Sequence, residues 1–314
     1  MIQTALTLRE NNTALQTSEI PTWTQRFFDY IDVREKSRYT YKGAVKQFMK
    51  YLYDNQITNP TRDTIIAWRE HLKTTDHKPT TIQLYLTAIK QFFGWAEVEG
   101  IGRNIASKVK GVKIQKGHKK DSLTSAQCKR ILGEMETESA QGKRNNAIIS
   151  LMLTTGLRTI EITRANIEDL RTLGDDTVLY IQGKGRDDKT EYIKVAPQVE
   201  KAIMDYLKTR SKTSAKQPLF ASESNENKYK RLSTRTIRKI AKSSLINAGL
   251  NSDRLTAHSF RHTAGTLALI NGAELTQVQQ LLRHTNINTT MIYLHSIDRA
   301  KNNSEYTVAN AIFG

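Results

Sequence analysis

Residues 256–295 read TAHSFRHTAGTLALINGAELTQVQQLLRHTNINTTMIYLH. His258 and Arg261 are three positions apart, so on a helix they lie one turn apart on the same face. Both side chains can then contact one ligand, which we expect to be an anion. His284 follows a helix predicted over residues 275–282, and Tyr293 comes nine residues later, after a turn-prone stretch. Nitrogen-rich side chains therefore precede a single hydroxyl.

This order of side chains suits phosphoryl transfer to a tyrosine. A phenol has a pKa of about 10 and is a poor nucleophile near pH 7 unless a base takes its proton or nearby cations favour the phenolate. Arginine forks fit two non-bridging oxygens of a phosphate and stabilise the charge of the transition state. A lone histidine or tyrosine would as readily be structural, so it is the ordered set that indicates chemistry.

The stretch resembles two conserved boxes of the tyrosine recombinases, the phage integrase family. HSFRH at 258–262 is similar to the second box, and LLRH at 281–284 with TTMIY at 289–293 is similar to the third. The first box has its match upstream, TGLRTIEI at 155–162. One departure is Arg283, where the family usually has glycine; it adds a phosphate contact or caps the preceding helix with a charge suited to its C-terminus.

The resemblance implies a set of catalytic residues: Arg158, Lys184, His258, Arg261, His284 and Tyr293. Tyr293 would attack the scissile phosphate to give a 3′-phosphotyrosyl link, with the two arginines and His284 holding the phosphate oxygens. His258 would move the tyrosine proton. Glu161 would orient Arg158, although a buried structural pair between these two is the alternative.

Lys184 would protonate the leaving 5′ oxygen from the tip of a predicted hairpin, whose strands run over 176–182 and 190–195. Arg186 and Lys189 are alternatives for this role. Because the phosphotyrosyl link retains the energy of the phosphodiester, no ATP, metal or other cofactor is expected.

A metal site is also disfavoured by the residues themselves. His258 and His262 have a spacing that could bind zinc, but no glutamate lies between them, no third ligand is evident, and Arg261 would oppose a cation. His262 is therefore interpreted as structural. Cys128 is the only cysteine, which excludes an intramolecular disulfide and a cysteine-cluster zinc site.

The charge of the chain indicates a polyanionic partner. The formal net charge is +17 and the sequence pI is about 9.8, which points to nucleic acid or an acidic membrane surface. Lys and Arg outnumber Asp and Glu in both 1–120 and 121–314, so a protein that grips DNA with two domains is favoured. No apolar run is long enough to span a membrane and no secretory signal is evident, so we expect a cytoplasmic protein without a membrane partner.

Helical periodicity and composition predict two mainly α-helical domains. Residues 1–20 are expected to be a flexible tail or a short partner-binding segment, 21–107 a four-helix domain that resembles the core-binding (SAM-like) domain of the family, and 108–121 a linker with six lysines. Residues 122–314 would form an α-rich catalytic domain with a small antiparallel sheet. Its tail, 296–314, would dock on a neighbouring protomer, as it often does in the family, or fold back in cis.

Basic helix faces supply candidate DNA contacts. Arg38, Lys42, Lys46 and Lys50 recur every four residues on the second predicted helix, Arg235, Arg238, Lys239 and Lys242 cluster on a helix predicted over 233–248, and Lys119 and Lys120 lie in the linker. A run of one sign is costly on an isolated helix, and phosphates would relieve the repulsion; a solvated face is the alternative. The helix over 233–248 could enter a major groove, reading bases or only phosphates.

The expected function is site-specific DNA recombination of the integrase or resolvase type. By resemblance, a homo-tetramer would act on double-stranded DNA with paired inverted sites through a Holliday junction, with accessory DNA-bending proteins as candidate partners. The short N-terminal segment leaves no room for a separate arm-binding domain, so the size is similar to that of the Xer enzymes. Two rivals are a type IB topoisomerase, which shares the chemistry, and a non-catalytic DNA-binding regulator.

Overall fold

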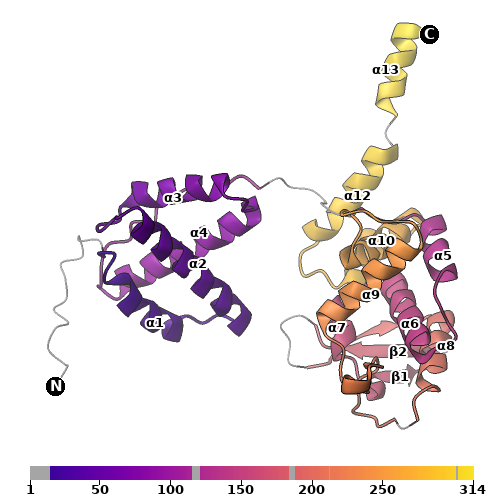
Figure 1. Ribbon diagram of the computed structural model, residues 1–314. Helices are drawn as coiled ribbons and strands as arrows, with labels where there is room; N and C mark the ends of the chain where they lie inside the picture. Colours follow the sequence, from indigo (N-terminus) through magenta and orange to yellow (C-terminus); the bar gives the residue numbers. More distant parts are fainter. Residues whose placement is uncertain (1–14, 115–120, 184–187, 212, 302) are drawn as a thin grey trace. The chain divides into compact units, whose positions relative to one another are not determined.

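The computed structural model describes residues 15–114, 121–183, 188–211, 213–301 and 303–314. The chain divides into two compact units, Met1–Lys116 and Gly117–Gly314 (Figure 1). This division falls within the lysine-rich stretch that suggested a linker. Among the described residues, no helix has the length and apolar character needed to cross a membrane.

The N-terminal unit is a helical domain. Its helices are α1 (Ile20–Tyr30), α2 (Glu35–Asp54), α3 (Arg62–Thr74) and α4 (Pro79–Val98). Thr61 caps α3 through reciprocal bonds with Thr64, and Pro79 opens α4 at a position that needs no backbone donor. Aromatic side chains form much of its core: Phe48 and Trp68 are buried and pack edge-on at a ring-centroid distance of 5.0 Å.

This unit begins earlier than the expected start at Pro21. Leu15 is 1% exposed and belongs to the same apolar core, while the Thr17 amide donates to the Thr58 carbonyl at 2.8 Å. The expected flexible tail over 1–20 is thus too long by at least residues 15–20. Leu15 and Ile20 are isolated apolar residues in a polar stretch, so periodicity does not reveal them. Residues 1–14 lie outside the described part of the chain.

The second unit is mainly helical and includes a small sheet. Its helices are α5 (Ser125–Gly133), α6 (Ala140–Thr155), α7 (Thr159–Arg164), α8 (Pro197–Leu207), α9 (Thr234–Asn247), α10 (Ala257–Ile270), α11 (Leu275–Leu282), α12 (Asn288–Lys301) and α13 (Ser304–Phe313), with short 3-10 turns at Ile167–Asp169 and Asn225–Asn227. The antiparallel sheet has the order β1-β2-β3 and is formed by Leu170–Leu173, Asp176–Ile181 and Glu191–Lys194. The predicted antiparallel hairpin is therefore confirmed, and β1 is an additional strand.

Gly156 allows the end of α6 to cross α10 and α11 closely. It ends α6 in the left-handed conformation, with φ at +60°. A Cβ atom there would lie 2.7 Å from Cδ2 of Leu282 and 3.3 Å from the Cβ of Ala264. Only glycine meets both the backbone and the packing requirement, and the crossing brings Arg158, two residues later, towards the other boxes.

We expect Gly156→Ala to destabilise the second unit more than Gly174→Ala. Both glycines have φ at +60°, but nothing lies within 4 Å of a Cβ at Gly174. Gly174→Ala should cost about 1 kcal/mol of unfolding free energy from backbone strain alone, and Gly156→Ala a further ~1–3 kcal/mol from overpacking. Urea unfolding followed by circular dichroism measures both. Equal losses would contradict the packing argument.

Candidate active site

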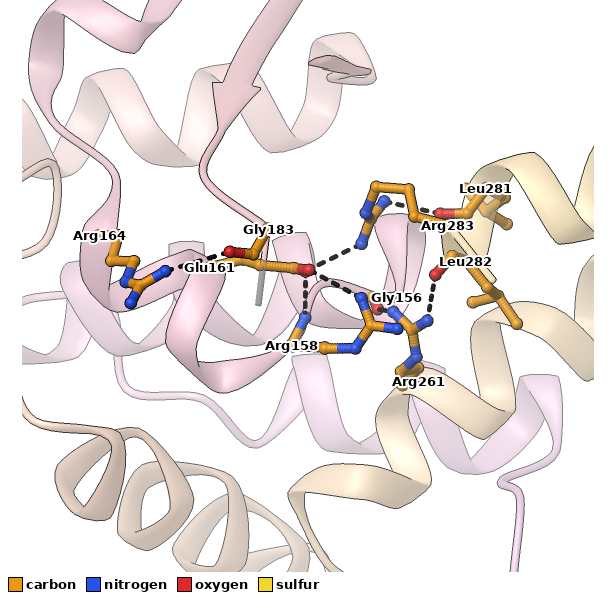
Figure 2. A network of polar contacts seen from close by, with 9 residues as sticks. All are labelled: Gly156, Arg158, Glu161, Arg164, Gly183, Arg261, Leu281, Leu282 and Arg283. Atoms are coloured by element: carbon orange, nitrogen blue, oxygen red, sulfur yellow. Dashed lines mark hydrogen bonds and ion pairs between the residues drawn. The ribbon is translucent and has the colours of Figure 1, made fainter. Parts of the chain in front are cut away.

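The three boxes contribute side chains from different elements of the second unit. Arg158 is the N-cap residue of α7 and Glu161 lies in its first turn. Arg261 lies on α10, and Arg283 follows α11 directly. Figure 2 shows these side chains converging on the carboxylate of Glu161 and on the turn at the end of α6.

Glu161 joins the first box to the third. Its Oε1 accepts a hydrogen bond from Nη1 of Arg158 at 2.9 Å, and its Oε2 accepts from the Arg158 backbone amide at 2.7 Å and from Nη2 of Arg283 at 3.0 Å (Figure 2). Burial raises the pKa of this carboxyl, but the charges of Arg283 and Arg158 and the bonds from Arg158 lower it below its usual value. Glu161 is therefore a buried anion shared by two arginines.

Arg261 is held by the ends of two helices. Its Nη1 donates to the carbonyl of Gly156 at 2.6 Å, and its Nη2 donates to the carbonyl of Leu282. Carbonyls at a helix C-terminus carry partial negative charge and favour a cation. Burial, with the charges of Arg158 and Arg283, lowers the pKa of Arg261 to about 9. The guanidinium stays protonated at neutral pH in a region with excess positive charge.

His284 is neutral at pH 7 in the DNA-free protein. Burial and then the charges of Arg261, Arg158 and Arg283 lower its pKa to about 4. Its Nδ1 lies 2.9 Å from the hydroxyl oxygen of Thr290. The imidazole stacks on the ring of Tyr293, with a centroid distance of 6.3 Å and an interplanar angle of 14°.

Tyr293 lies inside α12 and is 3% exposed. Burial raises the pKa of its phenol, which the charges of Arg261 and Arg158 only partly offset. Gly265 on α10 lies beside the ring: a Cβ there would touch it at an ordinary 3.5 Å but would lie only 2.8 Å from Cδ1 of Leu282. His262, interpreted from the sequence as structural, also borders the ring at a centroid distance of 5.3 Å.

Arg283 agrees with one of the two roles considered for it, the helix cap, and has a further contact. Its Nη1 donates to the carbonyl of Leu281 at 2.7 Å, which agrees with capping of α11, but its Nη2 pairs with Glu161, which neither alternative included. It is the αL residue that ends the helix, with φ at 51°, a conformation that glycine adopts most easily. Nothing in the sequence reveals the ion pair, because its partners are far apart in the chain.

The remaining predicted residues are placed less completely. His258 lies in the first turn of α10 and is exposed. Lys184 and Arg186 lie outside the described residues. Lys189, their alternative, pairs with the buried carboxylate of Asp169 at 2.5 Å. This pairing argues against Lys189 as a proton donor to substrate.

A cavity of about 890 Å³ opens beside these groups. Its lining includes Arg158, Arg283 and His284, together with Gly183 and residues 190–192 of the hairpin. The Gly183 carbonyl accepts from Nη1 of Arg164 at 3.1 Å (Figure 2), which fixes the end of β2 at the cavity. Within the described ranges, no group of three His, Cys, Asp or Glu could hold a metal ion.

Three of the four basic residues proposed as DNA contacts on α2 interact with other parts of the same domain. Arg38 is half-buried and donates to the Ile31 carbonyl at 3.3 Å, so it does not belong to an open face. Lys42 lies over the ring of Phe28, and Lys50 pairs with Asp54 at 2.7 Å. Lys46 is exposed.

On α9 the predicted basic face is smaller by one residue. Arg235, Arg238 and Lys239 are exposed, whereas Lys242 turns to the following loop and donates to the Ser252 carbonyl at 2.8 Å. A loop that returns past the helix end offers unpaired carbonyls, and a nearby ammonium satisfies them. Lys119 and Lys120 lie outside the described residues.

Comparisons with known proteins agree with this arrangement. Residues 121–299 match the phage integrase family, and residues 24–100 match its N-terminal SAM-like domain. The chain is 32% identical over 218 residues to tyrosine recombinase XerC of Caldanaerobacter subterraneus subsp. tengcongensis, covering 68% of this chain and 58% of that protein. It is 28% identical over 277 residues to tyrosine recombinase XerD of Lacticaseibacillus casei, covering 86% of this chain and 92% of that protein.

A solved structure extends the likeness to the fold of nearly the whole chain. A lambda integrase tetramer bound to a Holliday junction matches with a TM-score of 0.69 at 16% identity, over 93% of this chain and 81% of that chain. The family match over residues 121–299 includes all three boxes. The chain therefore belongs to the phage integrase family of tyrosine recombinases, with the family's SAM-like domain ahead of its catalytic domain.

Proposed function

We propose that this tyrosine recombinase cuts and rejoins double-stranded DNA in the cytoplasm, at specific paired sites in inverted orientation, through a 3′-phosphotyrosyl intermediate. The observation that carries the proposal is the convergence on one buried site of Arg158, Arg261, His284 and Tyr293. Their charges act on one another: both arginines lower the pKa of His284 and oppose the raised pKa of Tyr293.

In the proposed cleavage, Oη of Tyr293 forms a bond to the scissile phosphorus while the bond from phosphorus to the 5′ oxygen breaks. His258 accepts the phenol proton, and Lys184 gives a proton to the leaving oxygen. Rejoining is the reverse attack of a 5′ hydroxyl on the phosphotyrosine. The number of ester bonds is unchanged, so no external energy source is needed.

Arg158, Arg261 and His284 are proposed to hold the non-bridging oxygens. The Arg158 side chain is 29% exposed and lines the cavity, so its pairing with Glu161 leaves it able to meet a substrate. A phosphate there offsets the excess positive charge, and the arginines then stabilise both the phosphorane-like transition state and the phenolate. Glu161 serves to fix the direction of the Arg158 fork.

Assembly on DNA is proposed to involve four protomers that exchange strands in pairs through a Holliday junction. The tetramer seen for lambda integrase, whose fold this chain shares, supports this. So does α13, where four large apolar side chains are exposed: Tyr306, Val308, Ile312 and Phe313. We propose that α13 docks on a neighbouring protomer, which would cover them.

We expect Tyr293→Phe to abolish covalent attachment to DNA, because the variant lacks the attacking oxygen. The protein is incubated in EDTA with a library of nicked duplexes, and protein-linked DNA is separated on a denaturing gel and sequenced. Tyr306→Phe removes a hydroxyl from another tyrosine and should retain full attachment. Attachment should recur at one DNA sequence and should not depend on divalent metal.

Three results would contradict this scheme in different ways. Undiminished attachment in Tyr293→Phe would refute the nucleophile. Complete loss in EDTA would refute metal-free chemistry. Relaxation of supercoiled DNA of arbitrary sequence would instead indicate a topoisomerase.

Binding of DNA should raise the pKa of His284, because a phosphate anion favours the imidazolium. In the DNA-free protein the folded-state pKa is about 4, below the ordinary 6.5. Its contribution to folding stability is therefore complete above pH 6.5 and is lost as the pH falls towards 4. NMR titration of the labelled histidine, with and without a Tyr293→Phe–DNA complex, measures the shift.

A second measurement follows the pH dependence of the free energy of unfolding in urea between pH 7.5 and pH 5. His284→Gln should flatten the part of this dependence that His284 causes, while His77→Gln, in the other unit, should not. A His284 pKa that is unchanged by DNA would argue against contact with a phosphate.

Deletion of residues 307–314 should prevent stable assembly on paired sites while single-site cleavage of a nicked duplex continues. The physical reason is that most of the apolar surface of α13 is lost. Native gels and analytical ultracentrifugation of the DNA complexes measure assembly, and replacement of Val308, Ile312 and Phe313 by serine is the full-length control. Intact assembly in both variants would rule out docking in trans.

A further inference from the structure

Arg283 occupies a backbone position that disfavours it. Its φ of 51° and ψ of 50° are left-handed, and two helix ends in the chain with comparable positive φ carry Gly156 and Gly249. An L-residue in this conformation is sterically strained, because its Cβ crowds the following carbonyl oxygen. An arginine here therefore needs compensation from its side chain.

The side chain makes two directed bonds and is 8% exposed. Nη1 donates to the Leu281 carbonyl and Nη2 to Oε2 of Glu161, whose side chain is fully buried. In Figure 2 Arg283 and Arg158 reach the same carboxylate from different elements, one at the end of α11 and one at the start of α7. Oε2 thus bonds to both Arg283 and the Arg158 amide, while Oε1 bonds to the Arg158 guanidinium.

Direct binding of a phosphate by Arg283 is the less economical alternative. Both terminal nitrogens already have partners, and Nε is buried without a hydrogen-bond partner among the described residues. Each terminal nitrogen keeps a second N–H, but a phosphate that drew the guanidinium away from this position would break its pair with the buried Glu161. Separation of a buried ion pair is costly, since it leaves an imperfectly compensated charge.

We propose that Arg283 is a positioning residue for Arg158. By binding Oε2 of Glu161 it prevents rotation of the carboxylate, whose terminal torsion is otherwise broad, so that Oε1 stays directed at the Arg158 guanidinium. Arg158 is then aimed at the scissile phosphate before DNA arrives. This inference rests on the proposed function, in which Arg158 holds that phosphate.

The test compares cleavage by Arg283→Gln, Arg283→Lys and Arg283→Gly on the nicked duplex identified above. Rates are measured in single turnover at saturating DNA. The Gln and Gly variants should cleave about tenfold more slowly, less than the ~100-fold or more that direct loss of such a donor costs. The Lys variant should recover most of the rate because it retains the charge, and DNA affinity should be unchanged in all three.

Arg283→Gly keeps the test decisive if another variant folds poorly. Glycine suits the left-handed backbone and leaves the α11 helix end unstrained. A Gly variant that melts at least as high as the parent and still cleaves slowly would support positioning over a purely structural role.

Two further readouts separate positioning from general damage. A methylphosphonate at the scissile position lacks the charge that Arg158 would neutralise, so the deficit of Arg283→Gln should shrink on that substrate. In an Arg158→Lys background, Arg283→Gln should add little further loss, because both changes act on the same contact.

Failure of this inference is distinct from failure of the proposed function. If the parent protein formed no covalent link to any duplex, the proposed function would fall, and the inference with it. If the parent cleaved but Arg283→Gln and Arg283→Gly cleaved as fast, or if the two deficits multiplied in the double variant, the positioning role alone would be overturned.

Discussion

One buried carboxylate connects the parts of the catalytic unit that must meet. Glu161 accepts the amide that opens α7, bonds to the Arg158 side chain, and reaches across to Arg283 at the end of α11. Buried guanidinium groups are tolerated only when anions or carbonyls compensate them. Glu161 compensates two of them, and the helix-end carbonyls of Gly156 and Leu282 hold Arg261. The first and third boxes are thereby linked to each other through one side chain.

Glu161 does not neutralise all of the positive charge around it. Three guanidinium groups lie around one shared carboxylate, and the excess positive charge appears in the lowered pKa of Arg261 and of His284. Tyr293, buried beside them, keeps its proton. The arginine cluster is thus in place without DNA, while the imidazole of His284 and the phenol of Tyr293 are neutral. In the proposed mechanism, the charge that changes this balance comes with the substrate phosphate.

Much of this organisation was predictable from local sequence. Helical periodicity predicted four N-terminal helices and a helix over residues 275–282, which are the bounds of α11. The strand β1 was not predicted, because it is only four residues long, is mostly exposed, and has no alternation of apolar and polar residues. The spacing of residues along the chain also did not predict that Tyr293 lies within a helix and against His262.

Tertiary pairings were the main limit on predicting the site. Arg38 donates to the Ile31 carbonyl and Lys242 to the Ser252 carbonyl. Both bonds depend on loops that return past the helix faces. The bond from Arg283 to Glu161 joins residues far apart in the chain. A charge pattern shows that a side chain is basic, but only the fold shows whether its donors are already used.

The crowding of cations around Glu161 also bears on how long the protein survives in a cell. A site whose charges suit a ligand better than they suit one another lowers the stability of the empty protein, and ligand binding restores it by mass action. Protein bound to DNA would then be protected from unfolding, while unbound protein would unfold more often and be degraded by proteases in that state. In the proposed mechanism, the arginine cluster that holds the phosphate would in this way also link the abundance of the enzyme to the occupancy of its DNA sites.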